Sequence, residues 1–168
     1  TTIFHNEVSV LLTKSVALSI SALLFFIATS HADDTYTEQA TTIISFDGTP
    51  LKAMFTMPVT EPRGSVLILQ GSGNVDLDGD VSSPFLGNGY KGQQAKLSQQ
   101  LARTLAENGI ASLRFSKRGV DDANQLINQT MPYLIKDAQT ALNTLKAQFS
   151  ETKTALLGLS EGALIATT

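Results

Sequence analysis

Residues 156–166 read LLGLSEGALIA, an apolar run that is interrupted at Gly158 and resumes after Gly162. The apolar residues before the interruption predict a strand, and Glu161 begins a segment that suits a helix. A sharp turn between a strand and a helix needs small residues on both sides when the residue at its tip adopts a strained backbone conformation. The two glycines meet that need, so Ser160 is expected to stand at the tip of such a turn.

Two interpretations of Ser160 fit the pattern Gly-x-Ser-x-Gly. In the first, the hydroxyl is a nucleophile presented at the tip of the turn. In the second, Ser160 is an ordinary N-cap whose hydroxyl accepts a hydrogen bond from the first helical turn, a role that serine fills well. Three fixed positions arise by chance in about one chain in twenty of this length. The apolar strand before the pattern and the helix start after it favour the nucleophile.

Upstream of this turn, strand-like and helix-like segments alternate along the chain. The expected strands cover residues 41–46, 51–57, 65–70, 110–116 and 154–159. Strands that alternate with helices are typical of right-handed crossovers and a parallel sheet, whereas the first two strands, joined by a short turn, predict an antiparallel hairpin. The sequence therefore predicts an α/β fold with a mostly parallel sheet and an N-terminal antiparallel hairpin.

Two helices are predicted from apolar residues that recur at helical spacing. Leucine and alanine residues between Leu97 and Ala106 form one stripe, and Asn108 with Gly109 supplies the left-handed stop that ends a helix. Pro132 opens the second helix. The stripe of this second helix consists of Leu134, Ala138, Ala141, Leu142, Leu145 and Phe149. Each helix therefore has one face to bury against the sheet.

The composition of the 168 residues is that of one globular domain, with 42% hydrophobic and 16% charged residues. The net charge is −3, and no basic cluster is longer than Lys117-Arg118, so nucleic acid is not an expected partner. The chain has no cysteine, which excludes disulfides, cysteine-ligated zinc and thiol catalysis.

The N-terminal segment has the features of a secretory signal peptide. Lys14 precedes the apolar stretch 15–29, which closes on the small residues Ser30 and Ala32. Small residues at these two positions predict cleavage after Ala32, which makes residues 1–32 a signal peptide and the mature protein secreted or periplasmic. The alternative is an uncleaved membrane anchor, although the stretch is shorter than the roughly 20 residues that a spanning helix needs.

Three segments of the mature chain resemble the α/β-hydrolase superfamily, and the resemblance covers essentially everything from Thr41 onward. LLGLSEG (156–162) is similar to the nucleophile elbow of that family, and LILQGSGNVDLDG (67–79) to the loop after its third strand. LRFSKRGVDD (113–122) resembles the segment after the fourth strand of secreted esterases and serine aminopeptidase-like members. Dienelactone hydrolase-like members are a further subfamily that the pattern fits.

The resemblance implies that residues 33–168 form the N-terminal part of an α/β-hydrolase domain with Ser160 as the nucleophile. The backbone N–H groups of Ser72 and Glu161 would form the oxyanion hole, and Gly158 and Gly162 would be the elbow glycines. The expected activity is hydrolysis of an ester, thioester or amide bond in a small-molecule or peptide acyl substrate through an acyl-enzyme. No metal and no cofactor are expected.

In this family the catalytic acid and histidine follow the nucleophile along the chain. No aspartate or histidine follows Ser160 here, and the two histidines of the chain are His5 and His31. We therefore expect that the sequence is truncated after the nucleophile elbow and that the fragment is inactive, since a serine without a general base is a weak nucleophile. The last strand would also be an exposed edge, which predicts poor solubility or partial unfolding of residues 33–168.

A competing interpretation is a membrane-tethered, non-catalytic binding module with a hydrolase-like fold, which would meet a membrane only if the N-terminal segment stays uncleaved.

Weaker signals lie in two loops. Residues 74–80 imitate the start of a calcium loop, but Phe85 stands where a bidentate glutamate is needed. The basic side chains of the second loop contact either an anionic substrate or two nearby carboxylates. They are Arg114, Lys117 and Arg118, and the carboxylates are Asp121 and Asp122. Asp137 lies near the start of the second helix, where its negative charge is expected to interact favourably with the helix dipole, and no catalytic role is expected for it.

Overall fold

The structure is a computed structural model that describes residues 35–81, 95–121, 124 and 128–168. The strands are β1 (Tyr36–Ile44), β2 (Pro50–Pro58), β3 (Gly64–Leu69), β4 (Ile110–Phe115) and β5 (Thr154–Gly158), and the helices are α1 (Leu97–Glu107), α2 (Met131–Gln148) and α3 (Glu161–Ala166). This order of strands and helices confirms the one predicted from the sequence. The predicted signal peptide, residues 1–32, lies outside the described residues.

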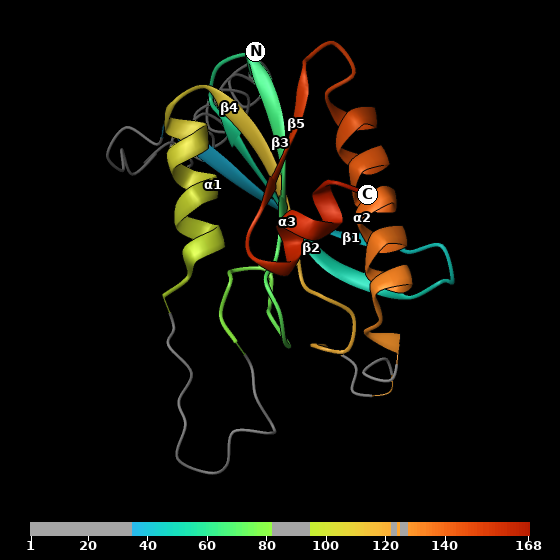
Figure 1. The fold of residues 1–168 in the computed structure, drawn as a ribbon. Coiled ribbons are helices and arrows are strands. Elements are labelled where there is room, and N and C mark those ends of the chain that lie inside the picture. The colour runs from blue at the N-terminus through green and yellow to red at the C-terminus, as the bar shows by residue number, and fades with distance from the viewer. Residues whose placement is uncertain (1–34, 82–94, 122–123, 125–127) are drawn as a thin grey trace, which may run out of the picture. The chain divides into compact units, whose positions relative to one another are not determined.

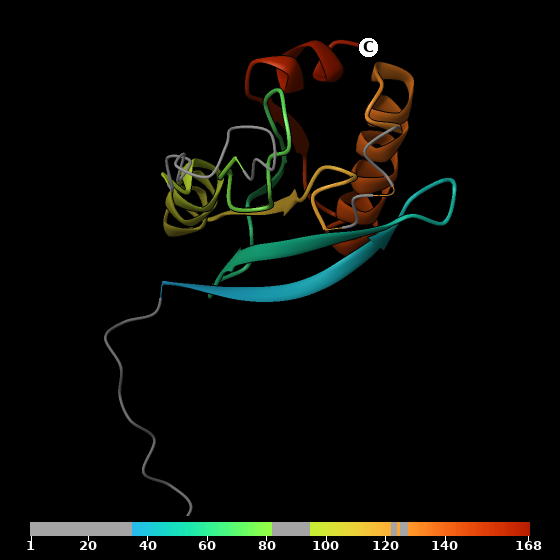
Figure 2. The same cartoon turned by 90° about the horizontal axis from the view of Figure 1, so that it is seen from below.

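The five strands form one sheet in the order β1-β2-β4-β3-β5 (Figure 1). β1 and β2 form an antiparallel hairpin, and β2 pairs antiparallel with β4. β3 pairs parallel with both β4 and β5. β2 is therefore the reversed strand of a sheet that otherwise runs in one direction, which confirms the predicted mostly parallel sheet with an N-terminal hairpin. Figure 2 shows the hairpin as two long, curved strands.

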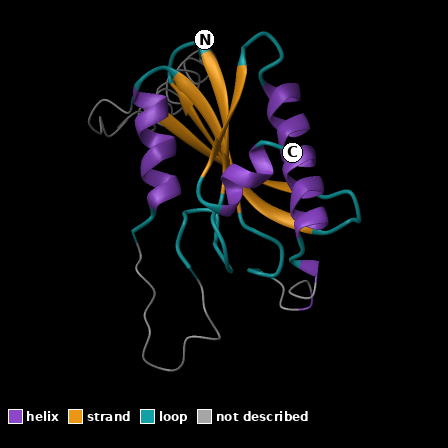
Figure 3. Cartoon of the chain, viewed as in Figure 1, coloured by secondary structure: helices purple, strands orange, loops and turns teal. Residues whose placement is uncertain are grey.

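Helices cover both faces of the sheet (Figure 3). On one face, Leu67 and Leu69 of β3 belong to a core that includes Ala141 of α2. On the other face, Val66 and Ile68 of the same strand pack against α1. Side chains of a strand alternate between its two faces, so the continuous apolar run of β3 supplies both cores.

The hairpin is buried on one face as its alternating sequence predicts. Leu51, Ala53 and Phe55 of β2 are buried in the α2-side core. Thr56 departs from the alternation of buried and exposed side chains along β2, because it is buried next to Phe55. Its hydroxyl accepts a hydrogen bond from the buried Arg114 guanidinium at 2.5 Å. A polar side chain is tolerated there because the hydrogen bond offsets its desolvation.

β5 forms an edge of the described sheet, because β3 is its one strand partner there. Leu156 on this strand is 40% exposed, and Leu164 on α3 is 61% exposed. This agrees with the expectation that β5 would be an exposed edge. Within the described residues, no helix has the length and apolar character needed to cross a membrane.

Candidate active site

Ser160 has a strained backbone conformation at the junction of β5 and α3. Its φ is 51° and its ψ is −113°, a combination that residues other than glycine rarely adopt. The structure records one other non-glycine residue with positive φ in the described part of the chain, Lys96. A side chain is kept in such a conformation when the surroundings force it or when function requires it, which marks Ser160 as a candidate functional residue.

The two glycines of the turn allow the backbone segments to approach one another closely. A Cβ atom at Gly158 would lie 2.4 Å from the backbone nitrogen of Ala163, and one at Gly162 would lie 2.3 Å from the carbonyl oxygen of Leu69. Contacts this short are impossible without a shift of the backbone. The glycines therefore let α3 begin directly against β3 and β5, which fixes the turn that carries Ser160.

Ser160 stands at the N-cap position of α3 without capping the helix. Its side chain makes no capping hydrogen bond, and its φ is positive, whereas an N-cap residue normally lies in the β region. The residue is exposed, so its hydroxyl is open to a reacting partner. The interpretation of Ser160 as an ordinary N-cap is therefore wrong.

The loop after β3 passes directly beside the turn. A Cβ atom at Gly71 would lie 3.7 Å from the Cβ of Ser160, and the amide of Leu159 donates to the carbonyl of Leu69 at 3.0 Å. Among the described residues, the structure records no hydrogen-bond partner for the backbone N–H of Ser72 or Glu161. Two unused donors on the segments that flank Ser160 suit an oxyanion hole. Their assignment to that role stays a prediction.

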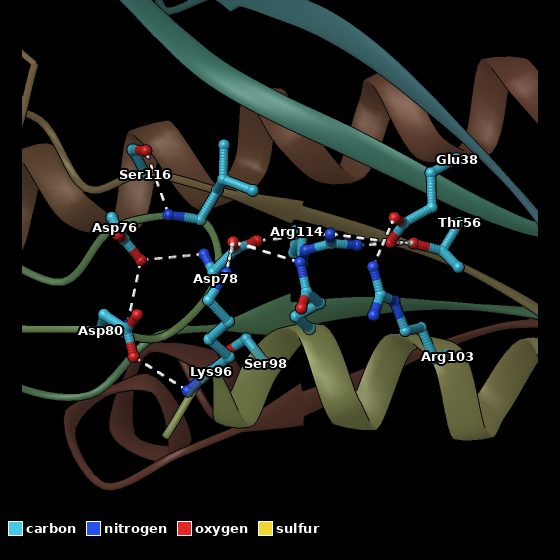
Figure 4. Close-up of polar contacts among 12 residues, drawn as sticks. Glu38, Thr56, Asp76, Asp78, Asp80, Lys96, Ser98, Arg103, Arg114 and Ser116 are labelled. Atoms are coloured by element: carbon cyan, nitrogen blue, oxygen red, sulfur yellow. Dashed lines mark hydrogen bonds and ion pairs between the residues drawn. The ribbon is translucent and has the colours of Figure 1, made fainter. Parts of the chain in front are cut away.

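The loop that follows is held by its own carboxylates, as Figure 4 shows. One carboxylate oxygen of Asp76 accepts hydrogen bonds from the amides of Asp78 and Asp80, at 2.9 and 3.0 Å. A carboxylate oxygen of Asp80 accepts from the amide of Lys96 at 2.9 Å, and the Ser116 hydroxyl accepts from the amide of Leu77. These carboxylate oxygens of the segment that resembled a calcium loop are therefore occupied by hydrogen bonds from backbone amides. Within the described residues, no group of three potential ligands could hold a metal ion.

Arg114 is buried and belongs to an ion-pair network beside this loop (Figure 4). Its guanidinium group donates to Glu38 at 2.9 Å and to Asp78 at 3.4 Å, and Arg103 also pairs with Glu38, at 3.0 Å. Burial by itself would raise the pKa of the Glu38 carboxyl, but the hydrogen bonds from Arg103 and Arg114 outweigh it and lower that pKa. The network joins β1, β4 and α1 to the loop after β3.

Lys117 lies just beyond β4 and reaches the candidate site. Its side chain is 7% exposed, and its ammonium group pairs with the Glu161 carboxylate at 2.5 Å. The same ammonium group donates to the carbonyl oxygen of Gly71 at 3.1 Å. Lys117 therefore connects the loop after β3 with the first residue of α3.

Arg118 is fully buried and pairs with two carboxylates, Asp137 and Asp47. Its guanidinium carbon lies 4.7 Å from the ring centroid of Tyr133 and 5.6 Å from that of Phe46. Burial would lower the pKa of Arg118, but the hydrogen bonds to Asp137 and Asp47 raise it. The main interaction of Asp137 is thus its ion pair with the buried Arg118, and not the expected interaction with the helix dipole.

These contacts correct the substrate interpretation of the basic residues in this segment and, for Asp121, the carboxylate interpretation. Arg114, Lys117 and Arg118 are all buried and paired with distant carboxylates, so none is free to meet an anionic substrate or pairs with Asp121. Asp121 instead pairs with Lys52 at 2.6 Å, and Asp122 lies outside the described residues. The sequence offered no local signal for these pairs, because the partners are far apart along the chain.

Comparison with known proteins finds similar structures but no match by sequence. No model of a protein family matches the chain, and no curated protein matches it significantly. Among solved structures, it is similar to a cold-adapted esterase from an Arctic intertidal metagenomic library, with 18% identity and a TM-score of 0.57. The match covers 82% of this chain and 56% of the esterase.

Two further structures are similar. A dienelactone hydrolase from Anabaena variabilis has 17% identity and a TM-score of 0.58, and the match covers 79% of this chain and 56% of that protein. A thermostable carboxyl esterase from Bacillus coagulans has 19% identity and a TM-score of 0.58, with 77% of this chain and 38% of that protein covered. The chain thus spans about half the length of these structures, or less.

The described part of the chain has the α/β-hydrolase fold, and the resemblance noted in the sequence is confirmed at the level of fold.

Proposed function

We propose that this protein is a serine hydrolase that cleaves an acyl bond by covalent catalysis at Ser160. The observation that carries the proposal is the conformation of Ser160, with a φ of 51°, on a turn that tolerates only glycine at positions 158 and 162. Such strain is costly and persists where the surrounding structure enforces it, often at functional sites. The similarity in fold to esterases supports an ester as the substrate class, with thioesters and amides as related alternatives.

In the proposed reaction, the Ser160 oxygen attacks the acyl carbon while its proton passes to a general base. A tetrahedral intermediate forms, and its negatively charged oxygen accepts hydrogen bonds from the N–H groups of Ser72 and Glu161. The leaving group departs with the proton that the base returns to it. Water then hydrolyses the acyl-enzyme by the same steps and releases the acid. These steps need no metal ion and no cofactor.

Residues 35–168 contain no histidine, the residue that most often serves as the general base of such a reaction, since His5 and His31 both lie before them. The Glu161 carboxylate, the acidic group next to Ser160 in sequence, is engaged by Lys117. We therefore propose that the 168-residue chain does not turn over an acyl substrate efficiently. The N-terminal segment supports export, so the substrate would be met outside the cytoplasm.

A fluorophosphonate probe tests this proposal on the full-length protein. We expect covalent labelling at Ser160, identified by peptide mass spectrometry, and no labelling of Ser160→Ala. The 168-residue chain should label far more slowly, because its serine lacks a base. The rates at which these proteins hydrolyse p-nitrophenyl esters should rank in the same order as their labelling rates. An unlabelled but well-folded gene product would favour the non-catalytic binding module instead, and labelling of Ser160→Ala would place the nucleophile elsewhere.

A further inference from the structure

We infer that Lys117 is a positioning residue for the oxyanion hole, because its ammonium group joins the two segments that carry the proposed amide donors of Ser72 and Glu161. This inference rests on the proposed function and adds a side chain to it. Among the described residues, the hydrogen bonds of the Lys117 ammonium group go to Gly71 and Glu161 and not to Ser160, so it acts through the backbone and not on the substrate.

The first half of the argument concerns the loop after β3. The Lys117 ammonium group donates to the carbonyl oxygen of Gly71 at 3.1 Å. That carbonyl and the N–H of Ser72 belong to one peptide unit, which is planar and trans, so the two groups point in opposite directions. Lys117 is buried and Ser72 is exposed. Holding the carbonyl toward the buried ammonium group therefore directs the Ser72 N–H away from it, toward the exposed side of the loop.

The second half concerns the first residue of α3. The Glu161 side chain pairs with the same ammonium group at 2.5 Å. Glu161 directly follows Ser160, and its backbone N–H is the other proposed donor. An ammonium group has three hydrogens, so one lysine can hold the Gly71 carbonyl and the Glu161 carboxylate together. A single side chain thereby links the two donor segments.

The backbone of Lys117 is itself fixed, which makes it a suitable anchor. Its amide donates to the carbonyl of Val75 at 3.1 Å, so the residue is tied to the same loop at a second point. The pair with Glu161 also differs from an ordinary surface ion pair. Lys117 is 7% exposed, whereas Lys52 in the pair with Asp121 is 65% exposed. Shielding from water strengthens the first pair relative to the second.

The inference is tested by the kinetics of fluorophosphonate labelling of the full-length protein. In Lys117→Met the apolar stem remains and the ammonium group is lost. We expect the maximal labelling rate to fall about 10- to 100-fold, since loss of one oxyanion-hole donor costs about 100- to 1,000-fold. The probe concentration at half-maximal rate should change little. Lys117→Arg should recover much of the rate, because its guanidinium group can donate to both partners, and Lys52→Met is the matched control.

A second measurement keeps the result independent of reactivity. In ¹H–¹⁵N NMR spectra of the 168-residue chain, Lys117→Met should shift the Ser72 and Glu161 amide resonances, whereas Lys52→Met should leave both unchanged. Unchanged amides and an unchanged labelling rate in folded Lys117→Met would overturn the inference. So would a lowered thermal midpoint with an unaltered rate per folded molecule, which indicates a purely structural role. Absence of labelling in the unmodified protein would overturn the proposed function and, with it, the role of Lys117 in an oxyanion hole. The NMR comparison would then show only whether Lys117 holds the segments of Ser72 and Glu161 together.

Discussion

Arg118 and Asp137 form a bidentate ion pair in which both side chains are excluded from water. The Nε of Arg118 donates to Oδ2 of Asp137 at 2.7 Å, and a terminal nitrogen donates to Oδ1 at 2.5 Å. The side chains are 0% and 1% exposed. Because Arg118 also pairs with Asp47 at 2.9 Å, this one guanidinium group links the loop after β4 to α2 and to the turn of the β1–β2 hairpin.

Arg118→Met should destabilise the protein strongly. Removing one partner of a buried pair leaves the other charge uncompensated, which costs about 3–5 kcal/mol of unfolding free energy. The loss includes the contacts of the guanidinium group with the Phe46 and Tyr133 rings. Urea unfolding followed by circular dichroism measures the change. The exposed pair of Lys52 and Asp121 gives the control, and Lys52→Met should cost less than about 1 kcal/mol.

Stability should fall in acid because two paired carboxylates have lowered pKa values. Hydrogen bonding from Arg118 lowers the pKa of Asp47 from 3.8 to about 2, and Arg103 and Arg114 lower that of Glu38 despite its burial. A lowered folded-state pKa gives stability that is complete above the unfolded-state pKa and is lost as the pH falls toward the folded-state value. The unfolding free energy should therefore drop from about pH 4.5 to about pH 2. Asp47→Asn should make the drop shallower, and an equal slope in that variant would contradict this assignment.

Most of the fold could be predicted from the sequence because its local patterns are strong. The stop at Asn108 and Gly109 ends α1 as expected, and Pro132 lies in the first turn of α2. The start of β1 was missed, because the strand begins at Tyr36 and not at residue 41. Its first residues are polar and mostly exposed, so they show no alternation; Glu38 among them is held by Arg114, a partner 76 residues away.

The candidate site was predictable where it depends on backbone geometry and not where it depends on distant partners. Small residues around Ser160 predicted a tight turn, since close approach of backbone excludes a Cβ atom. The partners of Lys117 and Arg118 could not be found the same way. Glu161 is 44 residues from Lys117, and Asp47 is 71 residues from Arg118, so only the folded chain brings these charges together.

Gly162→Ala should disrupt the turn that carries Ser160. The added Cβ would lie 2.3 Å from the carbonyl oxygen of Leu69, a backbone atom that cannot move aside without moving β3. Overpacking of this kind costs about 1–3 kcal/mol or more. Gly64→Ala is the control, because its Cβ would lie at an ordinary 3.5 Å from the nearest atom. Thermal unfolding of the two variants should differ clearly, and similar midpoints would mean that the turn tolerates a side chain.

The exposed edge formed by β5 should promote association of the 168-residue chain. Leu156 on this strand is 40% exposed, and an unpaired strand edge with apolar side chains is a template for pairing with another chain. Leu156→Lys should therefore raise the soluble concentration, since a charged residue blunts such an edge. Light scattering at increasing protein concentration measures this. Val59→Lys is the control, because Val59 is also exposed but lies away from this edge, on the segment after β2. An equal gain in solubility in Val59→Lys would show that the β5 edge does not cause the association.

The strain at Ser160 should be measurable as a stability difference between two substitutions. Alanine keeps the Cβ atom at a φ of 51°, whereas glycine adopts this conformation without steric cost. Release of about 1–3 kcal/mol of strain exceeds the roughly 0.5–1 kcal/mol that glycine loses through its freer unfolded chain. Ser160→Gly should therefore be about 1 kcal/mol more stable than Ser160→Ala by urea unfolding. At Ser150, whose φ is not positive, the order should be reversed, because both variants lose the hydroxyl and only glycine adds chain entropy. The same order at both positions would show that the conformation of Ser160 stores no strain.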